Sequence, residues 1–453
     1  MRTAKILLFI ALAFGSTAFA QVANKCESGF NAFEQSVLAG KYDEAAVQMA
    51  ELRKKCPKHS DKLYTYGETV LLYRIEMAMA PADKQGQVAD LAALYTEYAQ
   101  NYPKSDAVIK KALLQQEYKL ADDKELYKAL DGAFTSNSMA FIDYNALEAY
   151  FELLLKQYDG AKTISQEQFI EKYGAIGAQV AHAKSTIAAD KDALLKKQET
   201  EKLTAEESNR VSTADNKVEA LGVVAENMAL QASRIFDCSK LEAYYDKHYE
   251  VNKGNASWLE GLTTAMYGSK CFNSPVLYKG AQALNTAKPT AQTAYMLASI
   301  ELKRRNPKQA VVYFDQSAAL EKTPARKAAL YHDIASIFRN SDKGKAKEYA
   351  LKAAAQNPKF GKPYLMLAEM YTTAGKECGL SEFERKALTL LAIETVKKAE
   401  VAEPRYKTTV ASLVKNFEKN LPTDKEAKAA GKRKGDVISY GCWINEKVTL
   451  PKL

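Results

Sequence analysis

The sequence lacks the motifs that usually carry catalysis. Its four histidines, at positions 59, 182, 248 and 332, show no HExxH or other metal-ligand spacing. No GxSxG elbow, glycine-rich phosphate loop or dinucleotide fingerprint is present. We therefore expect no cofactor, no metal site and no enzymatic activity, and an enzyme of unrecognised type is the remote alternative.

The chain also lacks a long apolar run after its N-terminus, so no stretch matches the roughly 20 residues of a transmembrane helix. The N-terminus itself differs, because Arg2 and Lys5 precede an apolar run from Ile6 to Phe14, and Ala18-Phe19-Ala20 suits signal peptidase. We expect cleavage after Ala20 and a periplasmic protein, with full secretion as the alternative. Cys26 does not follow this cut directly, so we do not expect a lipoprotein.

Charge of one sign is only in modest excess. The chain has 64 Lys and Arg against 55 Asp and Glu, a formal net charge of +9 that falls to +7 without Arg2 and Lys5. Basic clusters such as 303–305 and 432–434 lie beside acidic residues, which indicates solvated surface. We expect no nucleic-acid partner.

What remains is a helical composition. Hydrophobic residues make up 47% of the chain, while its 12 prolines and 21 glycines are few for 453 residues. Period-two alternation is hard to find before the C-terminus. We predict an all-α fold, an α-solenoid of helical hairpins with a long charged helical segment in the middle and a short β-like C-terminal tail.

A repeated pair of helices supports this fold. In the clearest unit Tyr331, Ile334, Ala335 and Phe338 share one face of a first helix, and an alanine-rich second helix follows. A small residue after the aliphatic one lets the two helices approach closely. These features resemble the tetratricopeptide repeat (TPR). The units begin at Tyr295, Tyr331 and Tyr364, 36 and 33 residues apart.

The repeats extend beyond these three units. Helix patterns ending at Pro57 and Pro103 place similar hairpins at the N-terminus, and weaker periodicity continues to about residue 160. The expected division is 1–20 signal peptide, 21–160 N-terminal TPR-like repeats, 161–232 long charged helices, 233–422 C-terminal TPR repeats, and 423–453 charged helix and capping tail.

The segment 161–232 has no proline and alternating charges. Val211, Ala214, Val218, Leu221, Ala225 and Met228 follow steps of three and four, as in a coiled-coil seam. A projecting hairpin with its turn near 204–209 and an ordinary pair of solenoid helices are equally compatible with this pattern.

Six cysteines in an exported chain favour disulfides over metal binding, and free buried thiols are the alternative. Cys26 and Cys56 bracket the first hairpin, whose two ends lie side by side, and Cys238 and Cys271 bracket another. We therefore predict Cys26–Cys56 and Cys238–Cys271, which leaves Cys378 with Cys442 as a bridge that folds the tail back.

The regions around the last four cysteines resemble a family of exported TPR proteins of Bacteroidota, largely of unassigned role. The resemblance rests on Cys238-Ser-Lys-Leu, on Cys271-Phe-Asn-Ser-Pro, on Cys378-Gly, and on the ending Gly435-Asp-Val-Ile-Ser-Tyr-Gly-Cys-Trp-Ile-Asn-Glu446. It covers roughly residues 160 to 453 and implies compartment and fold rather than a biochemical task. The section 185–230 is longer and more charged than this family implies.

Recognition is the function that remains. In TPR proteins, first-helix residues that do not pack line a concave groove, and they predict a partner-binding groove here. The tail, with Trp443, either caps the last repeat or recruits a partner. The predicted groove residues are Met296, Ile300, Lys303, His332, Ser336, Arg339, Leu365, Glu369 and Thr372.

These expectations combine into a non-catalytic envelope scaffold for protein–protein interaction. It would be an accessory subunit of an outer-membrane secretion, assembly or motility complex, associated with that membrane through a partner. The 26 tyrosines and 16 phenylalanines motivate a glycan- or peptidoglycan-binding module as the alternative, although aromatics at helical spacing are ordinary solenoid core.

Overall fold

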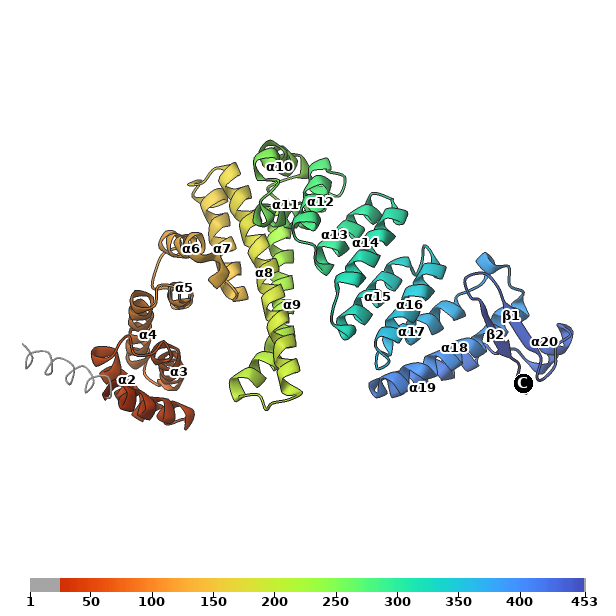
Figure 1. Ribbon diagram of the computed structural model, residues 1–453, viewed down its shortest axis with the longest axis horizontal. Coiled ribbons are helices and arrows are strands. Elements are labelled where there is room, and N and C mark those ends of the chain that lie inside the picture. Colours follow the sequence, from red (N-terminus) through yellow and green to blue (C-terminus); the bar gives the residue numbers. More distant parts are fainter. Residues whose placement is uncertain (1–24, 452–453) are drawn as a thin grey trace, which may run out of the picture. The chain divides into compact units, whose positions relative to one another are not determined.

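The computed structural model describes residues 25–451 and confirms the all-α fold class, with helical hairpins following one another along the chain (Figure 1). The expected signal peptide, 1–20, lies outside the described residues. Within the described part, no helix is long and apolar enough to cross a membrane. The chain divides into two compact units, Met1–Gly280 and Ala281–Leu453, so the boundary falls inside the expected segment 233–422.

The first unit opens with a helical segment, residues 25–38, and continues as a series of helices that pack mainly on their neighbours in sequence. These elements are α2 (Tyr42–Lys55), α3 (Lys62–Met77), α4 (Pro81–Asn101), α5 (Ala107–Glu117), α6 (Asp123–Asn137), the 3-10 turn η1 (Ser138–Ala140), α7 (Tyr144–Leu155), the π turn η2 (Lys156–Gly160), α8 (Gln166–Gln198), α9 (Ala205–Ser233), α10 (Cys238–Asn252), α11 (Ala256–Gly268) and α12 (Pro275–Ala287), which continues past the boundary.

Local sequence explains the first hairpin. Gly40 has φ +70°, a left-handed conformation that glycine adopts without strain, and it turns the chain from the first helical segment into α2. Tyr64 is almost fully buried and stacks on Tyr98 with ring centroids 4.9 Å apart, which joins α3 to α4. Arg53 of α2 reaches α4, donating to Asp90 at 2.6 Å and to Glu97 at 2.9 Å. The repeat-like packing therefore starts at the beginning of the described chain.

The charged segment forms one long hairpin of α8 and α9. Its turn is 199–204, slightly before the expected 204–209, because Thr204 and Glu207 form a capping box that starts α9. Ala214, Leu221 and Met228, seven residues apart, are buried, as the seam predicts. At the distal end the two helices pair with each other, through Lys191–Asp215 and Lys197–Glu207.

At its other end this hairpin packs closely on α11. Gly174 of α8 meets Gly261 of α11, and a Cβ atom placed on Gly261 would lie 2.9 Å from the carbonyl carbon and oxygen of Gly174. Only a residue without a side chain allows this backbone contact. The distal half of the hairpin therefore extends from a base that is packed into the first unit, which combines the two expected arrangements.

The second unit contains the three clear repeats. Each predicted first helix packs on the helix that follows it, as α13 on α14, α15 on α16 and α17 on α18. Ala335 and Ala368, the small residues of the second and third repeats, are fully buried, whereas Ser299 at the matching position of the first repeat is half-buried. The elements are α13 (Ala291–Lys303), α14 (Pro307–Leu320), α15 (Pro324–Phe338), α16 (Lys343–Gln356), α17 (Lys362–Thr372), the 3-10 turn η3 (Lys376–Cys378), α18 (Glu382–Ala402), the 3-10 turn η4 (Pro404–Tyr406) and α19 (Lys407–Glu418).

The tail forms the short hairpin that its sequence predicts. After α20 (Asp424–Ala429), strands β1 (Val437–Tyr440) and β2 (Glu446–Thr449) pair antiparallel, with Ile438 opposite Val448. The charged helix expected at the start of 423–453 is short and ends at Ala429, and Gly431 follows with φ +68°. Inward-facing side chains of the strands join the hydrophobic core of the second unit, so the tail is an integral part of that unit.

Candidate functional site

All six cysteines are paired, in the three combinations that the sequence predicts. Cys26 and Cys56 close the first hairpin with Cα atoms 5.7 Å apart. Cys238, which starts α10, joins Cys271, which follows α11, at 5.4 Å. Cys378 joins Cys442 of the tail at 5.6 Å. These Cα separations are those of ordinary protein disulfides.

The predicted groove residues of α15 and α17 lie next to each other. Arg339 donates to Glu369 at 2.8 Å, and the Ser336 hydroxyl lies 3.8 Å from the sulfur of Met366. Ser336, Glu369 and Thr372 are exposed. We call these four predicted residues, Ser336, Arg339, Glu369 and Thr372, the α15–α17 face. It is polar and of mixed charge, because its Arg and Glu form a surface ion pair with each other.

His332 lies beside this face and is half-buried. Its ring packs edge-on against Phe360 with centroids 5.6 Å apart. Burial lowers the pKa of His332, and the positive charge of Lys362 lowers it further. The imidazole is therefore mainly neutral at pH 7, and its Nδ1 atom is buried with no hydrogen-bond partner among the described residues. A packed neutral ring of this kind suits a contact surface better than a charged ligand site.

The other predicted groove residues differ in exposure. Ile300 is fully buried, so its assignment to an accessible groove is wrong. The repeat spacing assumes that this position faces the groove, but in α13 it faces the core. Met296 and Leu365 are half-buried, and Lys303 is exposed. Of the predicted groove, the α15–α17 face is therefore the part in which several predicted polar residues lie together on one surface.

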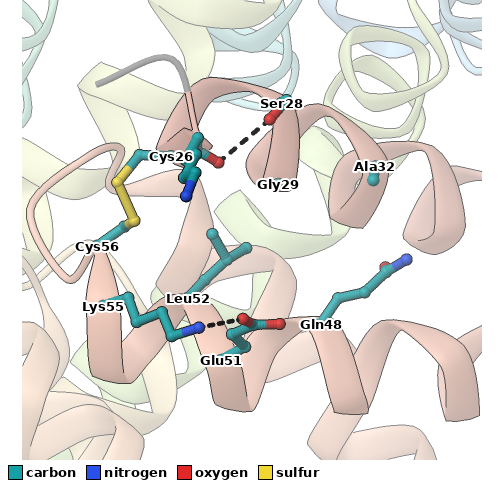
Figure 2. Close-up of a pocket in the computed structure, with 10 residues that line it drawn as sticks. Cys26, Ser28, Gly29, Ala32, Gln48, Glu51, Leu52, Lys55 and Cys56 are labelled. Carbon is teal, nitrogen blue, oxygen red and sulfur yellow. Dashed lines mark hydrogen bonds and ion pairs between the residues drawn. A yellow bond between two sulfur atoms is a disulfide. The ribbon is translucent and has the colours of Figure 1, made fainter. Parts of the chain in front are cut away.

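A pocket that the sequence did not predict lies in the first hairpin, with a volume of about 670 Å³ (Figure 2). Buried Leu52 forms its apolar part, and the Cys26–Cys56 disulfide forms one wall. The remaining lining residues are Lys25, Ser28, Gly29, Ala32, Gln48, Glu51 and Lys55.

The sequence signal for this pocket is a pair of small residues. Gly29 and Ala32, three apart, lie on one helical face opposite Leu52, and a Cβ atom on Gly29 would lie 3.3 Å from a Leu52 methyl group. Small residues on one helix face leave space that larger side chains would fill. Lys55 and Glu51 pair with each other along α2, so the charges at the rim are already partnered (Figure 2).

Trp443 of the tail is engaged in packing. Its ring stacks on Tyr371 of α17 with centroids 5.7 Å apart and planes 3° from parallel, and the Lys343 ammonium lies 5.5 Å from its centroid. Nearby, buried Lys347 donates to the backbone carbonyl of Ile444 and pairs with Glu446 at 2.7 Å. These contacts favour the capping role of the tail, and recruitment of a partner by Trp443 stays a prediction.

Among residues 25–451, no group of three or more His, Cys, Asp and Glu side chains is placed to hold a metal ion. Aromatic residues pack largely against one another inside the units, as Phe169 does with Tyr173 and Phe236. The arrangement offers helix faces and a pocket for contact with a partner.

The chain matches no family model and no curated protein. Among solved structures it is similar to yeast Tom70, with 12% identity, 90% of this chain and 94% of that chain covered, and a TM-score of 0.25. It is also similar to the TPR domain of P58(IPK), with 12% identity, coverage of 90% and 100%, and a TM-score of 0.22. The resemblance to exported Bacteroidota proteins stays a prediction.

Proposed function

We propose that this protein is a non-catalytic scaffold that binds another protein in the bacterial periplasm. In this proposal it is an accessory subunit of an outer-membrane secretion, assembly or motility complex. The observation that carries the proposal is the α15–α17 face, where exposed side chains of two successive first helices gather over a core of alanines and aromatics. Such a rigid face suits an extended or helical segment of a partner.

The disulfides support the proposed periplasmic location. Three bridges with the usual Cα separations, in a chain with an expected signal peptide, fit an oxidising environment. Two of them close hairpins of 30 and 33 residues, so they stabilise single repeats rather than link distant parts. A scaffold exposed to the periplasm would keep its repeats folded in this way.

The test is affinity isolation from gently solubilised envelopes with two double variants. Ser336→Arg with Thr372→Arg places two long cations on the α15–α17 face, where both positions are exposed. The control, Val312→Arg with Leu351→Arg, makes the same change on exposed positions of α14 and α16. We expect a stoichiometric partner that the control retains and the face variant loses.

Two outcomes would count against the proposal. One is a partner that both double variants retain equally, which would place the interface elsewhere. The other is the absence of any reproducible partner from envelopes of cells expressing the protein at its native level. Circular dichroism of each variant shows that the helices remain folded.

A further inference from the structure

The modest net charge of the chain conceals a strong difference between its two units. Residues 281–453 contain 31 Lys and Arg against 18 Asp and Glu, a formal net charge of +13. Residues 1–280 contain 33 against 37, a net charge of −4. A charge difference of this size between two parts of one chain suggests that the basic part meets an anionic partner.

Part of the excess lies in the tail, in the turn before β1 and on β2. Arg433 and Lys434 precede β1 and are exposed, and Lys447 is exposed on β2. Along β1 the residues alternate between exposed and buried, so Val437, which is 51% exposed, points outward together with Lys447 on the paired strand. We call these four exposed residues, Arg433, Lys434, Val437 and Lys447, the basic ribbon face.

The opposite side of the ribbon holds this face in place. Ile438, Tyr440 and Val448 are buried in the core of the second unit, and the Tyr440 hydroxyl donates to the backbone carbonyl of Glu384 at 2.8 Å. The Cys378–Cys442 disulfide ties the ribbon to the turn before α18. The cations are therefore presented by a fixed element rather than by a loose terminus.

Two of the three acidic residues around the ribbon are engaged elsewhere. Glu446 pairs with Lys347, and Glu426 pairs with Lys386 of α18. The third, Asp436, is half-buried, accepts from the backbone N–H of Arg433 at 3.0 Å and lies 3.9 Å from the Arg433 guanidinium. Among the described residues, Lys434 and Lys447 have no carboxylate within ion-pair distance. Two of the three positive charges of the face are therefore uncompensated.

We propose that the basic ribbon face binds the anionic headgroups of a phospholipid membrane. Each Lys or Arg near an anionic surface adds to the attraction, and several together give stable but salt-sensitive binding. Val437, exposed among the cations, adds an apolar contact that the lipid interface accepts and a soluble polyanion does not use. The inference goes beyond the proposed function, because it gives the scaffold a membrane contact that needs no protein partner.

The test is cosedimentation with vesicles. The chain used begins at Gln21, because the apolar leader would bind lipid by itself. It is mixed with vesicles of phosphatidylethanolamine and phosphatidylglycerol, or of phosphatidylcholine alone, at low and high salt. We expect binding to the anionic vesicles only, weakened by salt. Substituting Arg433→Glu, Lys434→Glu and Lys447→Glu together should weaken this binding by about 100-fold.

A matched control changes the same number of charges in the first unit. Lys104→Glu, Lys124→Glu and Lys202→Glu alter exposed lysines, and this variant should bind like the parent chain. The milder variant Val437→Asn should weaken vesicle binding while leaving binding to soluble polyglutamate unchanged. Coincident thermal unfolding curves show that each variant is folded.

Three results would overturn the proposal. The first is no binding of the parent chain to anionic vesicles at low salt. The second is equal loss of binding in the ribbon variant and the first-unit control, which would indicate a general charge effect. The third is binding to polyglutamate but not to vesicles, which would assign the face to an acidic polymer. Each result is independent of whether a protein partner is found.

Discussion

The α8–α11 contact of the first unit and the α15–α16 hairpin of the second bring two helices together with different residues. In the first unit, Gly174 and Gly261 touch through their backbones. In the second, buried Ala335 and Ala350 leave room for aromatic rings, and Phe338 stacks on Tyr349 with centroids 6.4 Å apart. A glycine contact has no spare volume, whereas an aromatic hairpin depends on the volume of its rings.

The two regions also differ in whether a disulfide closes them. The α10–α11 hairpin beside the glycine contact is closed by Cys238–Cys271, and α15–α16 has no cysteine at all. We infer that the α15–α16 hairpin is stabilised by the packing of its aromatic core, whereas the region of the glycine contact adds a covalent bond. Four variants, each with a control, test this contrast.

The largest effect is expected from emptying the aromatic hairpin. Phe338 is 2% exposed, and Phe338→Ala should lower the free energy of unfolding by about 4 kcal/mol through lost burial and a cavity. Urea unfolding of the second unit measures this change. The neighbouring Ile337→Ala, at a partly exposed position, should change stability by less than about 0.5 kcal/mol. Similar losses of unfolding free energy in the two variants would contradict the view that the aromatic core stabilises this hairpin.

Removal of the Cys238–Cys271 disulfide should cost slightly less stability. With its cysteines 33 residues apart, Cys238→Ala with Cys271→Ala should lower the free energy of unfolding of the first unit by about 3 kcal/mol, because the unfolded chain gains freedom. Ser239→Ala, at an exposed neighbour, is the control. An unchanged denaturation midpoint in the double variant would show that packing alone holds α10 on α11.

A methyl group on the glycine contact should be destabilising. Gly261→Ala places a carbon atom 2.9 Å from the backbone of Gly174, so α8 and α11 must separate, at about 2 kcal/mol. Gly132→Ala in α6 is the matched control, because its Cβ atom meets nothing within 4 Å. There the same change should stabilise by about 0.5 kcal/mol. If both variants shifted the midpoint of thermal unfolding in the same direction, the result would argue against the close contact.

The smallest expected effect is a gain in stability. The Tyr245 hydroxyl is buried against Gly174 and has no hydrogen-bond partner among the described residues, so Tyr245→Phe should stabilise the first unit by about 1 kcal/mol. In Tyr95→Phe the lost hydroxyl donates to Glu68 at 3.0 Å, so that variant should lose about 1 kcal/mol. Opposite shifts of the denaturation midpoints are the expected result, and a loss in both would mean that Tyr245 is hydrogen-bonded.

Much of this architecture could be predicted from local pattern. Ala335 and Phe338 were placed in a core because residues three or four apart share a helix face, and both are buried. The seam residues Ala214, Leu221 and Met228 follow the same rule. The glycine contact could not be predicted, because Gly174 and Gly261 come from helices far apart in sequence and neither glycine is distinctive in its own helix.

The candidate site was predictable only in part. Repeat spacing placed Ser336, Arg339 and Glu369 on one surface, and the structure brings them together. The same spacing failed for Ile300, because burial depends on what packs against a helix and not on its position in a repeat. The pocket beside Cys26 and the charge difference between the units became visible only once the units and their surfaces were defined.

By itself the sequence determined the helices, the hairpins and the two disulfides that close hairpins. These depend on residues close in sequence, or on hairpin ends that must lie side by side. Only the tertiary structure decided which polar residues meet, which carboxylates turn inward to Lys347 and Lys386, and which cations are left facing outward. The reason is that ion pairs and exposed faces depend on distances between elements, and a linear pattern does not contain those distances.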